Sequence, residues 1–451
     1  MAAANTDSEN SCSPGDGGGA DRAPLTRIGT FLNPDRARVL KVVSWGAIVA
    51  WCVWWGASIH QNTLIGAKRA WFAPPYFGID YLYNVDYPTR VWLSGKDPYE
   101  DKSHLFVYPP PVTRMFAWCK YFTPEQSLVI WIVALGLMAA GGAWAACVAR
   151  RRLGLSPIPV TTAIAAIGFS TPVVFAMERG NYDLVTVPLV IAALAVMKKK
   201  TWWADVLGGA ILAIAPWAKI YPGLLGVGLV GLRRWGALAS FVACGAAIGL
   251  VTLEENKRFL VNNDLHLAIT KYISDGSPEG AICPWNHSLT DHWKRIWART
   301  PLRPLRRIDG RIAAALILGP PLVWVSWHVF RCTRREKLAF PYLMWVVALA
   351  TFVPPVSNDY SLFFLPLTAL AVWSRRDPLL IQLTMYALVL WWQPIGLPIN
   401  GRLLILVKIA GLLAMGVSLA ERALEQQAAQ SAGGAEKPPA GVTESHLPLA
   451  A

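Results

Sequence analysis

The chain alternates long apolar runs with short polar segments that carry most of its lysines and arginines. The first run, Val39–Ile59, is long enough to cross a bilayer as a helix, which takes about 20 apolar residues. Eleven further runs follow, at residues 125–149, 157–177, 183–197, 203–217, 221–232, 235–254, 311–330, 338–355, 360–373, 378–394 and 403–420. The pattern predicts an all-α polytopic membrane protein with about twelve transmembrane helices.

Five basic clusters between these runs indicate how the helices are oriented. They are Arg150–Arg152, Lys198–Lys200, Arg233–Arg234, Arg331–Lys337 and Arg375–Arg376. If each run crosses once, all five lie on one side, together with the basic residues that precede the first run. Cytoplasmic loops carry an excess of Lys and Arg. We therefore expect both termini in the cytoplasm.

Composition divides the chain into one membrane domain and two tails. Residues 1–35 are rich in Gly, Ser, Asp and Asn and lack apolar periodicity, which predicts a disordered cytoplasmic tail. Residues 36–422 form the transmembrane domain. Residues 423–451, rich in Ala, Gln, Gly and Pro, predict a second disordered cytoplasmic tail.

Two long loops face the opposite, non-cytoplasmic side, at residues 60–124 and 255–310. In the first loop, Asp80–Leu93 and Pro111–Phe122 mix aromatic and polar residues. Such segments are typical of helices that lie in the membrane interface. Most of the unusual polar sequence is in these loops and in short turns on the same side, so we expect a functional site there.

The overall composition supports a membrane protein and excludes other classes. Mean hydropathy is +0.37 and only 16% of residues are charged, against about a quarter in soluble domains. The net charge of +14 comes from the short clusters and not from one patch, so it does not indicate nucleic-acid binding. The seven cysteines show no pairing that predicts a zinc site or a disulfide framework.

Two apolar runs are too short for straight spans and meet at Lys219-Ile220-Tyr221-Pro222. Broken backbone at membrane depth is tolerated where it is buried in protein or lines a wet cavity. This places Lys219 near a site. The alternative is that Lys219 only extends toward the membrane surface.

Two carboxylates follow the first span, Asp80 and Asp86. An interfacial carboxylate within reach of a hydroxyl suits a general base. Asp80 has an equally good structural interpretation, as the cap of the helix that follows it. We interpret Asp86 as structural rather than catalytic.

Three further segments have both a structural and a functional interpretation. Glu178-Arg179-Gly180-Asn181 is either a Gly turn with an ion pair, or a charge pair in which Arg179 binds phosphate. The second loop contains Asn286-His287-Ser288 and is basic, which suits anionic headgroups or plain solvent exposure. In Ser357-Asn358-Asp359-Tyr360, helix capping is the first interpretation.

Taken in order, these segments resemble glycosyltransferase family 87, whose members have the GT-C fold and use polyprenyl-phosphate sugars. The resemblance depends on Asp80 with Gly95-Lys96-Asp97-Pro98-Tyr99, Tyr108-Pro109-Pro110-Pro111, Arg179-Gly180-Asn181, Ala218-Lys219-Ile220-Tyr221-Pro222, Asn286-His287-Ser288-Leu289 and Ser357-Asn358-Asp359-Tyr360. It implies that Asp80 is the catalytic base. Many relatives have a His in the turn that matches Ser357–Tyr360, where this sequence has Tyr360. A role for histidine in the reaction is therefore assigned to His287 in place of this turn.

The resemblance implies an inverting transfer of a sugar, most often mannose, to a lipid or glycan acceptor on the non-cytoplasmic face of a bacterial cell membrane. Polar groups of the loops are expected to bind the substrates: Tyr83, Asp86, Arg179, Asn181, Lys219, Tyr221, Lys271, Asn286, His287, Asn358, Asp359 and Tyr360. No acidic cluster demands a metal and no cofactor is required, although the resemblance leaves a divalent metal open because GT-C enzymes vary on this point. The alternatives are a lipid-linked sugar flippase and a non-catalytic protein of envelope assembly.

Overall fold

The computed structural model describes residues 34–64, 77–100, 106, 108–261, 287–297, 303–354, 359–374 and 401–433. Within these ranges the secondary structure is entirely helical. The all-α prediction is therefore confirmed for the described residues. The predicted span at 378–394 lies outside them.

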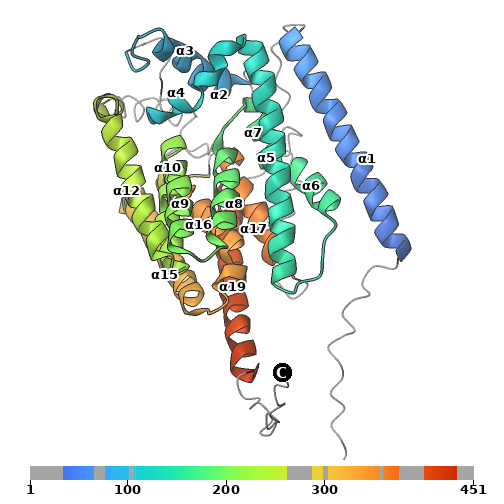
Figure 1. Ribbon diagram of the computed structural model, residues 1–451. Coiled ribbons are helices and arrows are strands. Elements are labelled where there is room, and N and C mark those ends of the chain that lie inside the picture. The colour runs from blue at the N-terminus through green and yellow to red at the C-terminus, as the bar shows by residue number, and fades with distance from the viewer. Residues whose placement is uncertain are drawn as a thin grey trace, which may run out of the picture.

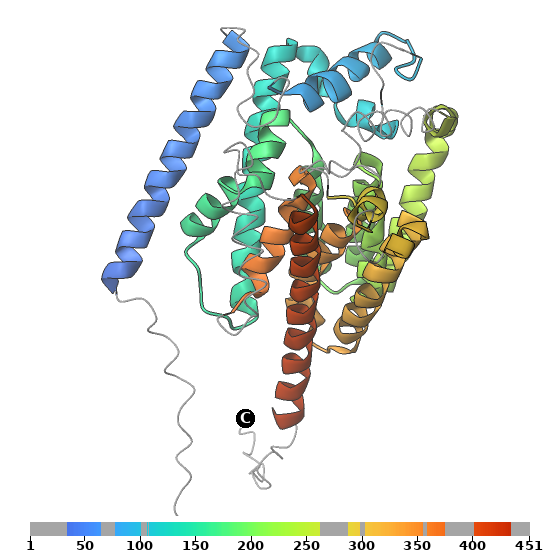
Figure 2. The ribbon, with the colours of Figure 1, turned by 180° about the vertical axis from the view of Figure 1, so that it is seen from behind.

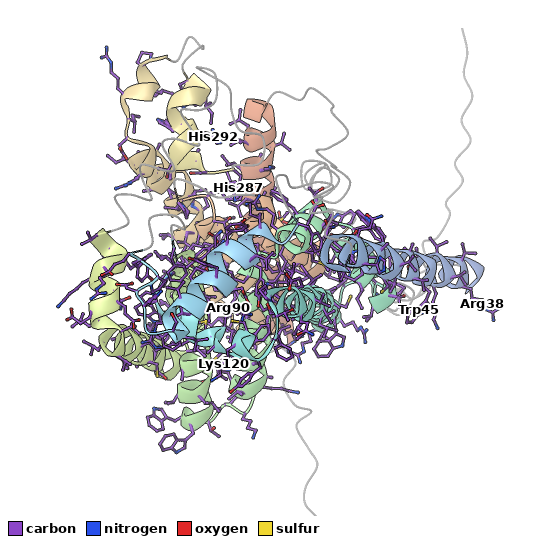
Figure 3. All side chains as sticks on the ribbon, turned by 90° about the horizontal axis from the view of Figure 1, so that it is seen from above. Arg38, Trp45, Arg90, Lys120, His287 and His292 are labelled. Carbon is purple, nitrogen blue, oxygen red and sulfur yellow. The ribbon has the colours of Figure 1, made fainter. Side chains whose placement is uncertain are left out.

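Three helices are long and apolar enough to cross a membrane: α1 (Pro34–Ile59), α5 (Pro124–Arg152) and α15 (Gly310–Arg331). Helix α5 begins at a capping box, in which the Thr123 and Gln126 side chains each bond the other's backbone amide. Figure 1 shows α1 at the edge of the bundle, and Arg38 and Trp45 mark it there in the view from above (Figure 3).

Two helix pairs add up to two further spans if each bent pair crosses once. Helices α6 (Val160–Gly168) and α7 (Thr171–Arg179) meet at 60°, and α12 (Trp235–Val251) meets the helix Leu253–Val261 at 83°. The described residues thus contain three to five candidate spans. The figure of about twelve crossings stays a prediction.

Six shorter helices complete the described part of the bundle. They are α8 (Thr186–Met197), α9 (Trp202–Leu212), α10 (Ala215–Ala218), α11 (Leu225–Gly231), α16 (Ala339–Ala350) and α17 (Phe364–Val372). Every residue of α16 and of α17 is buried, because both helices are apolar on all sides and pack inside the bundle. In Figure 1 they lie behind α5, α8 and α9.

The break predicted at Lys219 is present. Helix α10 ends at Ala218, Lys219 is extended, and the 3₁₀ helix η6 (Tyr221–Leu224) follows. Pro222 lies in the first turn of η6, where its missing N–H costs no helical hydrogen bond.

A cover of short helices lies across one end of the bundle. It contains α2 (Ile79–Tyr81), η3 (Leu82–Asp86), α3 (Tyr87–Leu93), α4 (Pro111–Met115) and η4 (Ala117–Tyr121). Figure 1 shows it at the top, and Arg90 and Lys120 lie on it in Figure 3. Both loop segments predicted to be helical are helical.

Four of the five basic clusters lie at the opposite end, which we call the basic end. Lys200 and Arg234 both contact Glu336, at 3.2 and 3.4 Å. The first residues of α1 and the last of α19 (Gly401–Gly433) lie at the same end (Figures 1 and 2). The fifth cluster, Arg375–Arg376, lies outside the described residues.

The C-terminal tail begins later than the sequence predicts, because helix α19 extends past residue 422. The helix continues to Gly433, so the prediction of disorder is wrong for residues 423–433. This stretch consists mostly of Ala, Gln, Glu and Leu, which are strong helix formers. Arg422 pairs with Glu425 one turn later, at 3.0 Å.

Candidate functional site

Asp80 is a buried carboxylate whose oxygens face a cation and an amide. The side chain of Arg179 donates to both oxygens, at 2.6 and 2.9 Å, and Asn181 donates to one of them at 3.1 Å. Helix α2 begins after Gly78, and no side chain caps it. The capping interpretation of Asp80 is therefore wrong. Its carboxylate joins the cover to the end of α7.

The turn after α7 holds these partners in place. Gly180 ends the helix in the left-handed conformation, with φ of 68°. The Asn181 oxygen accepts from the backbone amide of Asp183 at 3.0 Å, while its nitrogen donates to Asp80. Arg179 also forms an ion pair that joins the turn to Asp80 of the cover. The turn thus brings α2 and the end of α7, which are about 100 residues apart in the sequence, into contact.

A second buried ion pair lies at the other end of the same turn, where the 3₁₀ helix η5 (Asp183–Val185) begins. The ammonium of Lys219 contacts the carboxylate of Asp183, which also accepts a hydrogen bond from Ser361. The side chain of Lys219 is 15% exposed and that of Asp183 is fully buried. The surface-directed interpretation of Lys219 is therefore wrong. Asp183 and Ser361 are not among the site residues predicted from the sequence.

Three tyrosine rings surround the Lys219 ammonium. The rings of Tyr108, Tyr182 and Tyr221 have their centroids 5.8, 5.7 and 6.0 Å from it. These distances are within the range of cation–π attraction. Tyr108 also packs edge-on against Tyr182, 4.7 Å between centroids. Of the three, only Tyr221 is among the site residues predicted from the sequence.

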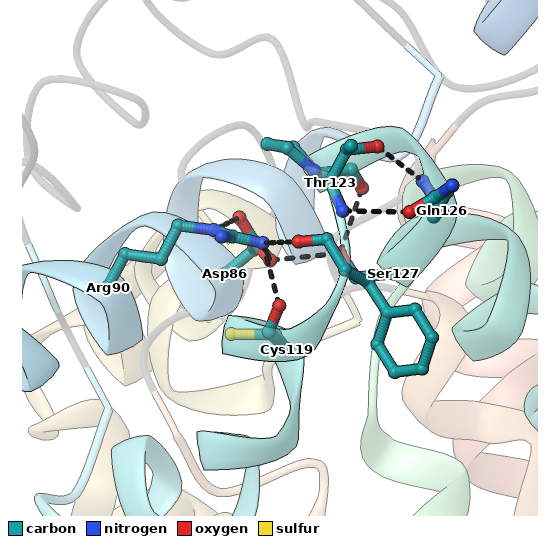
Figure 4. Close-up of polar contacts among 8 residues, drawn as sticks. Asp86, Arg90, Cys119, Thr123, Gln126 and Ser127 are labelled. Atoms are coloured by element: carbon teal, nitrogen blue, oxygen red, sulfur yellow. Dashed lines mark hydrogen bonds and ion pairs between the residues drawn. The ribbon is translucent and has the colours of Figure 1, made fainter.

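Asp86 has a structural environment of its own (Figure 4). Arg90, one turn later on α3, donates to both of its oxygens at 2.7 and 3.0 Å, and the Ser127 hydroxyl donates at 2.9 Å. Arg90 also donates to the carbonyl of Cys119, and burial raises the pKa of the Cys119 thiol to about 12. These contacts tie α3 to η4 and α5, in line with the structural interpretation of Asp86.

His287 is buried at the base of α14 (Leu289–Trp297). Its Nε2 lies 3.2 Å from the Thr351 hydroxyl, and its ring packs edge-on against Phe352, 4.9 Å between centroids. These contacts join α14 to the end of α16. In the view from above (Figure 3), His287 and His292 lie near each other, to one side of the cover helices that carry Arg90 and Lys120.

For the remaining predicted site residues, the structure describes fewer contacts or none. Tyr83 lies on the cover and is 46% exposed. Asp359 and Tyr360 begin η9 (Asp359–Phe363), which packs on α7, but their side chains are not described. Lys271, Asn286 and Asn358 lie outside the described residues.

The paired groups can act on an anionic substrate. Two carboxylates and two cations are joined through one short turn, and three tyrosines adjoin one of the cations. An incoming phosphate can compete with the carboxylates for Arg179 and Lys219, which releases a carboxylate to accept a proton. Among the described residues, no three His, Cys, Asp or Glu side chains are grouped as metal ligands.

The comparisons with known proteins agree with this chemistry. A model of glycosyltransferase family 87 matches residues 106–357, more than half of the chain. Arg179, Asn181 and Lys219 lie within the matched region, whereas Asp80 precedes it. The chain is also similar to a Mycolicibacterium smegmatis protein named polyprenol-phosphate-mannose-dependent alpha-(1-2)-phosphatidylinositol pentamannoside mannosyltransferase. The two are 31% identical over 178 residues, which cover 36% of this chain and 41% of the relative.

Proposed function

The chain belongs to glycosyltransferase family 87, and on that premise we propose that it transfers mannose from a polyprenyl-phosphate donor to a lipid or glycan acceptor. The donor and the sugar are supported by the name of the relative, which is polyprenol-phosphate-mannose-dependent. We place the reaction at the cover end of the bundle, facing away from the cytoplasm. This orientation is supported by the basic clusters at the other end.

Asp80 is the general base of the proposed reaction. The acceptor oxygen bonds to the anomeric carbon while the carbon–oxygen bond to the phosphate breaks, and the electron pair leaves with the phosphate. The acceptor's proton goes to Asp80. One carboxylate is enough for a transfer that inverts the anomeric centre. The observation that carries this assignment is the burial of Asp80 against two groups of the family-matched turn, Arg179 and Asn181.

The cations of the site stabilise the leaving group. Polyprenyl phosphate departs as an anion, so it needs positive partners more than a protonating acid. Arg179 presents a planar fork that matches a phosphate, and Lys219, which pairs with Asp183 at the other end of the turn, supplies a second positive charge. When the phosphate takes up the Arg179 guanidinium, the Asp80 carboxylate loses its ion pair and becomes available to the acceptor hydroxyl.

The test is a transfer assay with purified protein and labelled polyprenyl-phosphate-mannose. Asp80→Asn should lower the rate by a factor of about 100 or more, the typical contribution of a general base. Asp86→Asn is the matched control, because Asp86 is also buried and paired with an arginine. It should retain most of the rate once the amount of folded protein is equalised. Equal losses in both variants would exclude Asp80 as the specific base.

A flippase for lipid-linked sugars is the second candidate, and the broken backbone at Lys219 favours it, since discontinuous helices also mark transport sites. The two functions separate in vesicles. A transferase forms a mannosylated product whose yield depends on the acceptor. Donor movement across the bilayer without any product, and unchanged in Asp80→Asn, would support the flippase instead.

A further inference from the structure

A cavity of about 540 Å³ is lined by residues of the basic end, among them Arg152, Lys198 and Glu336. In Figure 1 this end of the bundle lies opposite the cover, which carries Asp80 on α2. The cavity opens between α5, α8 and α16. Its wall is apolar and is formed by Trp144, Val148, Ile191, Leu194 and Phe340. These side chains belong to helices of the bundle, so the wall continues from the helix ends toward the apolar middle of the protein.

The rim of this cavity is strongly positive. Arg152, Lys198, Arg234, Arg335 and Lys337 line it, against one carboxylate, Glu336. Glu336 is already shared by Lys200 and Arg234. Among the residues described, Arg152, Lys198 and Lys337 face no carboxylate within ion-pair distance.

The environment of Arg335 shows the same excess of positive charge. Its guanidinium donates to the carbonyls of Leu232 and Cys332, at 2.9 and 3.3 Å. Burial, together with the nearby Arg233 and Arg234, lowers the pKa of Arg335. A bound anion would relieve this repulsion.

Exposed tryptophans place the rim at the depth of lipid headgroups. Trp202 and Trp203 at the start of α9 are 62% and 72% exposed, and Trp235 at the start of α12 is 55% exposed. Trp144, in the cavity wall, is 50% exposed. Tryptophan gathers at the boundary between headgroups and acyl chains. The cations therefore lie level with phosphates, and the apolar wall lies level with acyl chains.

We propose that this cavity binds one anionic phospholipid of the leaflet at the basic end. The lipid phosphate contacts Arg152, Lys198 and Lys337, and one acyl chain lies along Trp144 and Ile191. Charge complementarity selects an anion, and the apolar wall selects a lipid over a soluble phosphate. The site is separate from the proposed donor site, which lies at the other end of the bundle, so it does not depend on the proposed function.

The experiment uses the full-length protein in mixed vesicles with a phosphatidylglycerol that carries a photoreactive group on its acyl chain. Crosslinks should map to the peptides that contain Trp144–Arg152 and Ile191–Lys198. The triple variant Arg152→Gln, Lys198→Gln, Lys337→Gln should lower this crosslinking by about tenfold or more. The matched control is Arg151→Gln, Lys199→Gln, Arg334→Gln, which removes the same charge from the same three clusters at exposed positions that do not line the cavity.

The control variant should crosslink like the unmodified protein, and the same photoreactive group on phosphatidylcholine should label these peptides weakly. If both triple variants lost crosslinking equally, the labelling would depend on the general surface charge of this end and not on the cavity, which would overturn the proposal. So would full competition by millimolar inorganic phosphate, which would indicate a soluble-anion site. Stronger labelling after removal of residues 434–451 would assign the cavity to that segment of the chain instead.

Discussion

Asp80 and Asp183 are buried carboxylates, and each is paired with one cation of the site. Burying a charge away from water costs several kcal/mol, and an ion pair in the interior does little more than offset that cost. Apolar residues of similar size would stabilise the fold at least as well. Two such pairs joined by one turn are therefore better explained by chemistry than by stability.

Removing one member of a buried pair should destabilise the protein more than removing both. Lys219→Met leaves the Asp183 charge unpaired, which we expect to lower the free energy of unfolding by about 3–5 kcal/mol. Lys219→Met combined with Asp183→Asn removes both charges and should recover most of that loss. Thermal unfolding of the detergent-purified variants measures the difference. Equal destabilisation by the single and the double variant would contradict a charge-based cost.

Both variants should also be inactive in transfer, since each lacks the cation proposed to hold the leaving phosphate. Lys219→Arg keeps the charge and is the matched control. If the double variant is both stable and active, Lys219 has no part in binding phosphate.

The sequence supported Asp80, Arg179, Asn181 and Lys219 as candidates because each is a polar residue in an unusual setting. It did not indicate which of them pair. Asp183 was overlooked because it opens an apolar span and belongs to no recognised motif. A carboxylate at the start of a membrane span costs free energy, so such residues are usually functional. The position of Asp183 was therefore the signal that could have identified it as a site residue.

At the scale of elements, the turn after α7 determines the position of Arg179 and Asn181 relative to α2. The backbone amide of Gly78 donates to the carbonyl of Glu178 at 2.7 Å, and the indole of Trp131 donates to the carbonyl of Gly180 at 2.9 Å. Two carbonyls of the turn are thus held, one by a backbone amide next to the cover and one by a side chain of α5. A change at Gly180 should be transmitted to the Asp80 ion pair.

Gly180→Ala tests this link. The left-handed backbone costs an alanine about 1–2 kcal/mol. Its Cβ would also lie 2.7 Å from the Cβ of Tyr81, the residue after Asp80, so the cover must shift. We expect a transfer rate at least about tenfold lower, even at equal amounts of folded protein.

Gly141→Ala is the control for that variant. Gly141 lies inside α5, and apart from the neighbouring backbone of its own helix no atom lies within 4 Å of the position that an alanine Cβ would take there. Alanine should therefore be neutral or stabilise the helix by about 0.5–1 kcal/mol. An active Gly180→Ala enzyme would show that the turn tolerates displacement of the cover.

Element boundaries were predictable where apolar runs ended in charged or helix-breaking residues, as at Lys219 and at both ends of α5. The bend between α6 and α7 was not, because the run at 157–177 contains no charged residue and Ser170-Thr171-Pro172, where α7 begins, is only a weak local signal. The extension of α19 was also missed. Low hydropathy suggested disorder there, although the helix propensity of residues 423–432 is high.

At the scale of the whole molecule, the two ends of the bundle have different chemistry. The cover end holds the Asp80 and Lys219 ion pairs, and the basic end holds four lysine and arginine clusters with exposed tryptophans. This polarity allows a sugar-transfer site and a lipid site to coexist without overlap. It also makes the orientation of the protein in the membrane a direct test of the proposed function, because the acceptor must reach the cover end.

Lys120 on η4 and Lys199 after α8 are both exposed and mark the two ends. We expect a membrane-impermeant maleimide, added to intact spheroplasts, to label Lys120→Cys but not Lys199→Cys, each in a chain whose native cysteines are replaced by serine. Disrupting the membrane should then expose Lys199→Cys to the same degree. The reason is the excess of Lys and Arg at the basic end, which is retained in the cytoplasm during insertion. The reverse pattern would place the Asp80 site in the cytoplasm and exclude transfer on the outer face.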